Sequence, residues 1–155
     1  MVEIVKVLSF VVLGYILGSF PTGVIVGKKF KNIDIREHGS KNSGATNAYR
    51  VLGTKLGITV LLGDIFKGFL PLLVGYFFNL SENQLILVGV AAILGHTFSP
   101  FLNFKGGKGV ATSLGVFLFL VPEVIITLII IFIAVVYFSK YISLASIIVS
   151  VLFPI

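Results

Sequence analysis

The chain has no cysteine, no tryptophan and only two histidines, and charged residues make up 12% of its 155 positions. The lack of cysteine excludes a disulfide framework and any cysteine-ligated metal. The two histidines, His38 and His96, lie far apart in the sequence, so a histidine-based metal site is a poor candidate too. We therefore expect no metal and no cofactor. A soluble domain usually carries about twice this share of charged residues, which argues against a soluble fold.

Long apolar runs fill most of the sequence instead. Hydrophobic residues make up 57% of the chain, and the mean hydropathy is +1.10. Between residues 111 and 139 the only charged residue is Glu123. Because a membrane-spanning helix needs about 20 apolar residues, the sequence predicts an all-α, polytopic transmembrane helix bundle with about six spans. We expect one transmembrane domain that covers residues 1–155.

Polar breaks divide the apolar runs into separate expected helices. The first break is a hydrophilic segment at residues 28–55, and a glycine-rich loop and short polar turns make the later ones. The expected helices cover residues 4–27, 56–78, 85–101, 110–121 and 124–138, and a last apolar run begins near residue 142.

The basic residues are distributed very unevenly along this bundle. A net charge of +6 would fit a nucleic-acid partner, but the positions of the charges give a simpler account. Ten basic residues fall on one side of the membrane, in segment 28–55, in the glycine-rich loop and at Lys140, whereas only Lys6 falls on the other. Because cytoplasmic loops carry the excess of lysine and arginine, we expect both polar segments in the cytoplasm and the N-terminus outside. We expect no nucleic-acid partner.

The hydrophilic segment contains a run of small hydroxyl, amide and glycine residues that begins at Gly39. Glycine lets the backbone approach a ligand closely, and the side chains of Ser40, Thr46 and Asn47 can donate hydrogen bonds to phosphate oxygens. Arg50 can bind the same kind of group through two parallel hydrogen bonds. The pattern predicts an anion site on the cytoplasmic side.

A second candidate anion site is the glycine-rich loop FKGGKGVAT at residues 104–112. Exposed N–H groups and the positive end of the helix dipole favour anions where such a loop enters a helix. The loop is not a P-loop, because glycine follows its second lysine where a P-loop has serine or threonine, so it gives no support to nucleotide hydrolysis. Both polar segments also fit a simpler function as tight turns whose cations meet lipid headgroups.

Three ionisable residues are expected inside the membrane. Asp64 and Lys67 lie three residues apart, so they share a helix face and can pair. A structural ion pair beneath the site is the favoured interpretation, because a catalytic carboxylate beside a phosphate would repel it. His96 is expected near the middle of its helix, roughly two to three turns from the glycine-rich loop. A hydrogen bond to a neighbouring helix is a commoner role for such a histidine than catalysis.

The first expected helix carries four glycines in two pairs: Gly14 and Gly18, then Gly23 and Gly27. Small residues spaced four apart let two helix backbones approach closely. Pro21 lies between the pairs and allows a kink. We therefore expect one long helix with close packing against a neighbour.

Several short motifs, in their order along the chain, resemble those of the bacterial acyl-phosphate:glycerol-3-phosphate acyltransferases. They read GSFPTG, DIR, GSKNSGATN followed by Arg50, DIFKG, GH and FKGGKGVAT. Each motif alone is weak, but the ordered set covers nearly the whole chain and is specific. The resemblance implies an integral membrane enzyme of phospholipid synthesis.

That family moves a fatty acyl group from acyl phosphate to the 1-hydroxyl of glycerol 3-phosphate, which gives lysophosphatidic acid and phosphate. The resemblance implies these two substrates, contact with membrane lipids, and a multi-pass protein of the cell (inner) membrane whose site faces the cytoplasm. It also implies that Ser40, Arg50 and Lys105 are catalytic. The substrate-binding residues that it implies are Gly39, Thr46, Asn47, Gly106, Gly107, Lys108, Gly109 and Thr112, with possible support from Asp64, Lys67 and His96.

Two mechanisms and two other classes of function remain open at this point. Direct attack by the glycerol hydroxyl is favoured over a covalent acyl-serine at Ser40 with His96 as its base. A small transporter or binding protein for an organic phosphate would also use glycine-broken helices and cationic loops. Its site would lie near the bilayer midplane between repeats, and no repeat is visible here. A purely structural subunit would not need both polar segments on one face.

The C-terminal part differs from the family pattern. Members of the family usually continue with a further helix and a third motif that carries histidine, asparagine and glutamate. This sequence ends at Ile155 in an apolar run. The resemblance therefore leads us to expect that the sequence is shortened at this end and lacks the last helix of the family.

Overall fold

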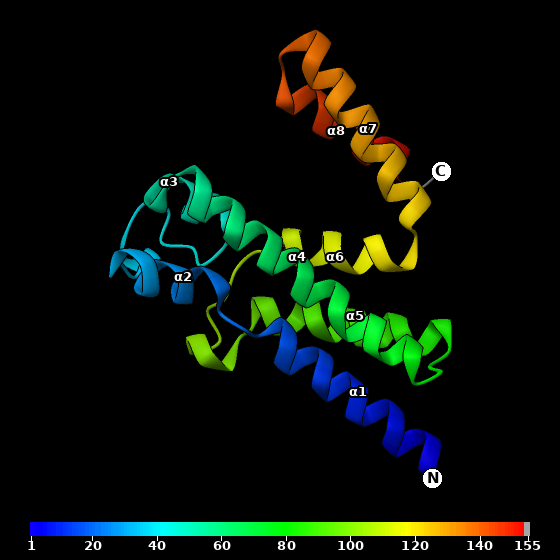
Figure 1. Ribbon diagram of the computed structural model, residues 1–155. Coiled ribbons are helices and arrows are strands. Elements are labelled where there is room, and N and C mark those ends of the chain that lie inside the picture. The colour runs from blue at the N-terminus through cyan, green and yellow to red at the C-terminus, as the bar shows by residue number, and fades with distance from the viewer. Residues whose placement is uncertain (154–155) are drawn as a thin grey trace. The chain divides into compact units, whose positions relative to one another are not determined.

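The computed structural model describes residues 1–153, without the side chains of Ile142, Ser143, Ser146 and Ser150, and all regular elements in that range are helices (Figure 1). This confirms the predicted all-α class. The α-helices are α1 Val2–Gly18, α2 Thr22–Lys31, α3 Ala45–Leu52, α4 Thr54–Phe77, α5 Glu82–Thr97, α6 Val110–Leu120, α7 Pro122–Ser139 and α8 Ile142–Leu152. Two short 3-10 helices, η1 Ile35–Glu37 and η2 Pro100–Leu102, lie in the connections.

The chain divides into two compact units, Met1–Phe119 and Leu120–Ile155. In the first unit α1, α4 and α5 pack against one another, and α2 and α3 also pack against α4 (Figure 1). In the second unit α7 packs against α8. The single domain expected for residues 1–155 stays a prediction.

Four stretches among the described residues are long and apolar enough to cross a membrane: Val2–Lys31, Thr54–Phe77, Glu82–Leu102 and Pro122–Ser139. Helices α6 and α8 have 11 residues each. At a rise of about 1.5 Å per residue such helices are shorter than the hydrocarbon core of about 30 Å. The four long apolar stretches agree with the predicted membrane class, whereas the count of six spans and the orientation of the N-terminus stay predictions.

The prediction of one continuous first helix is wrong. Helix α1 ends at Gly18 and α2 begins at Thr22, because Pro21 lacks an N–H group and its ring obstructs the preceding turn. A break at membrane depth requires partners for the freed backbone groups. The hydroxyl of Ser99 donates to the Ser19 carbonyl over 2.6 Å, and the Lys67 amine donates to the Phe20 carbonyl over 2.7 Å. The other parts of the protein thus stabilise the break.

The hydrophilic segment is also more ordered than a loop. It contains the end of α2, then η1 and α3, whose apolar side chains form a buried cluster. Ile35, Ala48 and Val60 in this cluster are fully buried, and Leu102 from η2 joins them. Because η2 directly precedes the glycine-rich loop, this cluster fixes the two polar segments to one another.

The four glycines of the first membrane segment do allow close approach, as predicted, but to two different partners. A Cβ atom at Gly14 or Gly18 would overlap the α5 backbone at Val88 or Ala92. A Cβ atom at Gly23 would instead overlap the carbonyl of Ser43, which lies in the hydrophilic segment. The second pair of glycines therefore accommodates a loop and not a helix.

Candidate functional site

The first polar segment is organised around the buried side chain of Asn47, which is 1% exposed. Its amide nitrogen lies 2.7 Å from the carbonyl oxygen of Ile35, 3.1 Å from that of His38 and 2.9 Å from that of Asn42. Its oxygen accepts the backbone N–H of Ser40 over 2.9 Å. In this structure the donors of Asn47 bind the backbone of its own loop, and its predicted role toward a phosphate stays a prediction.

The position of the Asn47 side chain also requires glycine at position 39, before Ser40. Gly39 has a φ angle of +58°, a left-handed conformation that favours glycine, and a Cβ atom there would overlap the Asn47 side-chain oxygen. The loop that results leaves the side chains of Ser40, Thr46 and Arg50 exposed. These three predicted site residues are therefore available to a ligand, and their roles stay predictions.

A second stabilising contact in this segment is an ion pair between Asp34 and Arg36. The Asp34 carboxylate accepts the Arg36 Nε and Nη2 groups over 3.0 and 2.7 Å, and also its backbone N–H over 3.1 Å. Lys28 Nζ lies 3.3 Å from the same carboxylate. The hydrogen bonds from Arg36 hold the pKa of the Asp34 carboxyl well below its usual range, and the same bonds raise the pKa of Arg36. This pair fixes the start of η1.

We expect the variant Asp34→Asn to loosen residues 32–44 at neutral pH. A carboxyl group with a lowered pKa stabilises the folded segment above its unfolded-state pKa of about 4, and this contribution is lost as the pH falls below that value. Amide hydrogen exchange, corrected for intrinsic rates, should show constant protection in the unmodified protein from neutral pH to about 5 and a decline below about 4. In Asp34→Asn the protection of these amides should already be low at neutral pH and should change little as the pH falls. Glu37→Gln, a change at an exposed neighbour in η1, is the control. Equal protection in Asp34→Asn and in the unmodified protein at neutral pH would show that the ion pair of Asp34 and Arg36 does not stabilise this segment.

The glycine-rich loop folds back onto the end of α5. The N–H groups of Gly106 and Gly107 donate to the carbonyls of Thr97 and His96 over 2.9 and 3.1 Å. Their backbone amides are therefore bound to carbonyls of α5, and the predicted role of both glycines in substrate binding stays a prediction. The first N–H groups of α6 have no partners within their helix and are the ones that the loop can offer. The side chains of Lys105 and Lys108 are exposed.

Thr112, which the resemblance implies to bind substrate, lies in the first turn of α6, and that role stays a prediction. The residue is 0% exposed, and a Cβ atom at Gly68 would overlap its backbone carbonyl. Its hydroxyl has no hydrogen-bond partner among the described residues. Gly68 thus allows α6 to pack closely on α4, and Thr112 belongs to that packing contact.

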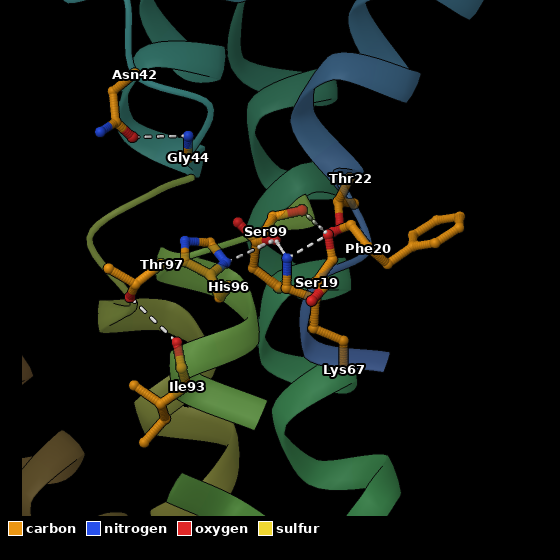
Figure 2. A network of polar contacts seen from close by, with 11 residues as sticks. Ser19, Phe20, Thr22, Asn42, Gly44, Lys67, Ile93, His96, Thr97 and Ser99 are labelled. Atoms are coloured by element: carbon orange, nitrogen blue, oxygen red, sulfur yellow. Dashed lines mark hydrogen bonds and ion pairs between the residues drawn. The ribbon is translucent and has the colours of Figure 1, made fainter. Parts of the chain in front are cut away.

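A buried polar cluster lies between α4, α5 and the break in the first membrane segment (Figure 2). One oxygen of Asp64 is 2.8 Å from Lys67 Nζ and 3.8 Å from His96 Nδ1. All three side chains are buried. Figure 2 shows Lys67 beside Phe20, whose carbonyl it binds, and His96 on the side toward Ser99. The predicted pairing of Asp64 with Lys67 is confirmed.

His96 lies at a different place from the one expected. It is the last residue but one of α5, and its carbonyl accepts the Gly107 N–H. A Cβ atom on Gly107 would overlap its Nε2 atom. The prediction that two to three turns separate His96 from the glycine-rich loop is therefore wrong, because α5 ends at Thr97 and the loop turns back on it.

The cavity beside this cluster has a volume of about 10 Å³. That is room for about one water molecule. Ser43 of the first polar segment and Leu102 of η2 line it together with His96. The first polar segment and η2, which precedes the glycine-rich loop, therefore both border the cluster, and the cavity has no room for a substrate in this structure.

Comparison with known proteins agrees with this arrangement. The sequence profile of one family, described as Glycerol-3-phosphate acyltransferase, matches residues 8–155. The chain belongs to this family. The glycerol-3-phosphate acyltransferase of Fusobacterium nucleatum is 60% identical over 146 residues, which are 94% of this chain and 75% of that protein. The one from Bacillus subtilis is 51% identical over 136 residues, 88% of this chain and 70% of that protein.

Solved structures of the family are similar as well. The crystal structure of PlsY, an integral membrane glycerol 3-phosphate acyltransferase, in its glycerol 3-phosphate form has a TM-score of 0.78 and 39% identity, and covers 94% of this chain and 73% of that one. The lysophosphatidic acid form has a TM-score of 0.79 and 37% identity, with 96% and 74% covered. The protein is an integral membrane acyltransferase.

Sequence reasoning missed the residues that close the helix break in this acyltransferase. Ser99 donates to the Ser19 carbonyl, and the Tyr15 hydroxyl donates to the Phe98 carbonyl over 2.6 Å. The one signal in the sequence was Pro21 inside an apolar run, because a proline there leaves carbonyls that must find donors elsewhere. Which side chains supply those donors depends on the tertiary packing.

Proposed function

We propose that this acyltransferase uses acyl phosphate as its donor and forms lysophosphatidic acid from glycerol 3-phosphate. It does so on the cytoplasmic face of the cell (inner) membrane, where the excess of basic residues lies. The observation that supports this most directly is that Arg50 and Lys105 are both exposed cations, on two segments that a common apolar cluster holds together. A dianionic substrate and a dianionic leaving group require such charges.

The reaction needs no covalent intermediate. The 1-hydroxyl oxygen of glycerol 3-phosphate attacks the acyl carbonyl carbon, the bond from that carbon to the phosphate oxygen breaks, and phosphate leaves with the electron pair. A phosphate oxygen takes the proton of the hydroxyl. Because acyl phosphate is already an activated anhydride, the protein mainly positions both substrates and stabilises the charge of the oxyanion and the departing phosphate. Arg50 and Lys105 supply the charge, and Ser40 orients an oxygen.

The surroundings of His96 support direct transfer over an acyl-serine. A serine nucleophile needs a base within hydrogen-bond reach. His96 has Nδ1 toward Asp64 and Nε2 against Gly107, so both nitrogens face other groups than Ser40. His96 is also buried, whereas Ser40 is exposed.

The test is phosphate release from palmitoyl phosphate by the purified protein, with and without glycerol 3-phosphate. We expect release that depends on glycerol 3-phosphate and that falls about a hundredfold or more in Arg50→Ala and in Lys105→Ala, the usual effect of removing a group that stabilises transition-state charge. Mass spectrometry should detect lysophosphatidic acid in the same reaction.

Lys29→Ala is the matched control, since Lys29 is an exposed cation of α2 outside both predicted anion-binding runs. Its activity should remain close to that of the unmodified protein. Palmitoyl-coenzyme A in place of palmitoyl phosphate should give no product. Product from the coenzyme A ester alone would overturn the proposed donor. Full activity in both variants would overturn the proposed roles of the two cations.

A further inference from the structure

The glycine-rich loop rests on the His96 side chain and on the last two carbonyls of α5, those of His96 and Thr97. The Gly107 N–H donates to the His96 carbonyl, and a Cβ atom on Gly107 would overlap the His96 ring. A Cβ atom on Gly106 would overlap the His96 carbonyl oxygen. Two consecutive glycines are therefore required so that the backbone can lie on this residue. Lys105 and Lys108 directly flank them, so the place of His96 sets the place of both lysines.

The opposite side of the His96 ring faces the buried pair of Asp64 and Lys67, and its Nδ1 atom has no hydrogen-bond partner among the described residues. Its Nδ1 atom lies 3.8 Å from an oxygen of Asp64, and the same oxygen lies 2.8 Å from Lys67 Nζ. Lys67 Nζ also donates to the carbonyl of Phe20 in the helix break. Hydrogen-bonded contacts thus join the break between α1 and α2 to Asp64 of α4, and His96, which holds the glycine-rich loop, lies directly beside them.

These contacts fit a positioning role, because the space beside them is small. The cavity that Asp64, Lys67 and His96 line has a volume of about 10 Å³, which is smaller than any phosphate or acyl group needs. We propose that His96 is a positioning residue, which holds the glycine-rich loop so that Lys105 and Lys108 face the phosphate of glycerol 3-phosphate. This inference rests on the function proposed above, since it names that substrate.

The test compares three variants of the full chain: Gly107→Ala, His96→Ala and the double variant. The added methyl group of Gly107→Ala forces the loop off the His96 ring, so KM for glycerol 3-phosphate should rise roughly tenfold or more, with a smaller change in kcat. His96→Ala should raise KM in the same way. The double variant should be no worse than His96→Ala, because removal of the ring leaves space for the methyl group and the two changes act on one contact.

Amide hydrogen exchange of residues 103–110 provides a readout that does not depend on activity. We expect faster exchange in His96→Ala than in the unmodified protein, and no change in Leu94→Ala, a lipid-facing control on the last turns of α5. His96→Gln, which keeps a side-chain polar group in a similar volume, replaces the alanine variant if that protein does not fold.

The outcomes separate the two proposals. If His96→Ala lowers kcat while KM and loop exchange stay unchanged, the residue acts on the reaction itself and the positioning role is overturned. The same conclusion follows if the KM effects of the two single variants multiply in the double variant. If exchange increases as expected but glycerol 3-phosphate never stimulates phosphate release, the positioning role stands and the proposed function fails.

Discussion

Replacing Lys67 with methionine should lower the free energy of unfolding by about 3–5 kcal/mol, the cost of leaving a buried charge without its partner. The ammonium group is the only one of the described cations that binds both Asp64 and a backbone carbonyl of the helix break. Without it the Asp64 carboxylate remains buried and uncompensated, and the Phe20 carbonyl loses its donor. Methionine has nearly the same length and shape, so packing losses contribute little.

Two further variants show whether the effect has this cause. In Asp64→Asn/Lys67→Met no charge is left behind, so the double variant should be more stable than Lys67→Met alone. Lys6→Met removes a lysine from an exposed pair with Glu3, whose charged atoms are 3.9 Å apart. An exposed pair contributes about 0–1 kcal/mol, so this control should unfold almost as the unmodified protein does. Unfolding in mixed micelles, followed by circular dichroism, measures all three. Equal stability of Lys67→Met and Lys6→Met would rule out a buried ion pair as a source of stability.

The helix break shows why the sequence predicted the first membrane segment only in part. Apolar runs of sufficient length define a span by composition alone, and composition is visible in the sequence. Pro21 is compatible with either a kink or a complete break. The outcome depends on two donors far along the chain: Lys67, 47 positions from Phe20, whose carbonyl it binds, and Ser99, 80 positions from Ser19. A local pattern contains no information on partners so distant.

The candidate site was also predictable only in part. Arg50 and Lys105, predicted to act on anionic groups, are both exposed, and their roles stay predictions. The same reasoning assigned Asn47 and Thr112 to the substrate, although they are 1% and 0% exposed. An asparagine in a polar loop can bind a ligand or the carbonyls of its own backbone, and the sequence of the loop is the same in both cases. Burial decides between the two, and burial depends on the packing of α3 against its neighbours.

The close packing of α1 on α5 leads to the second prediction with a large effect, for Gly18→Ala. Each of the two helices presents a glycine to the backbone of the other, since a Cβ atom on Gly18 would overlap the Ala92 carbonyl and one on Gly95 would overlap the Tyr15 carbonyl. A carbonyl within a helix cannot rotate away as the end of a side chain can. Helix α1 must therefore move, which strains the bond from the Ser99 hydroxyl to the Ser19 carbonyl, 2.6 Å long.

We expect Gly18→Ala to cost about 3 kcal/mol of unfolding free energy, at the upper end of what one added methyl group causes in a packed interior. Gly63→Ala is the matched control: it also adds a methyl group to a glycine of a membrane helix, but the atom in its way is the side-chain methyl carbon of Thr22, at 2.6 Å. That side chain can change its rotamer, so the control should lose less stability. Thermal unfolding in detergent compares the two variants. If both lose the same stability, the contact of the α1 backbone with the α5 backbone does not determine how closely these helices pack, and the closed helix break must have another origin.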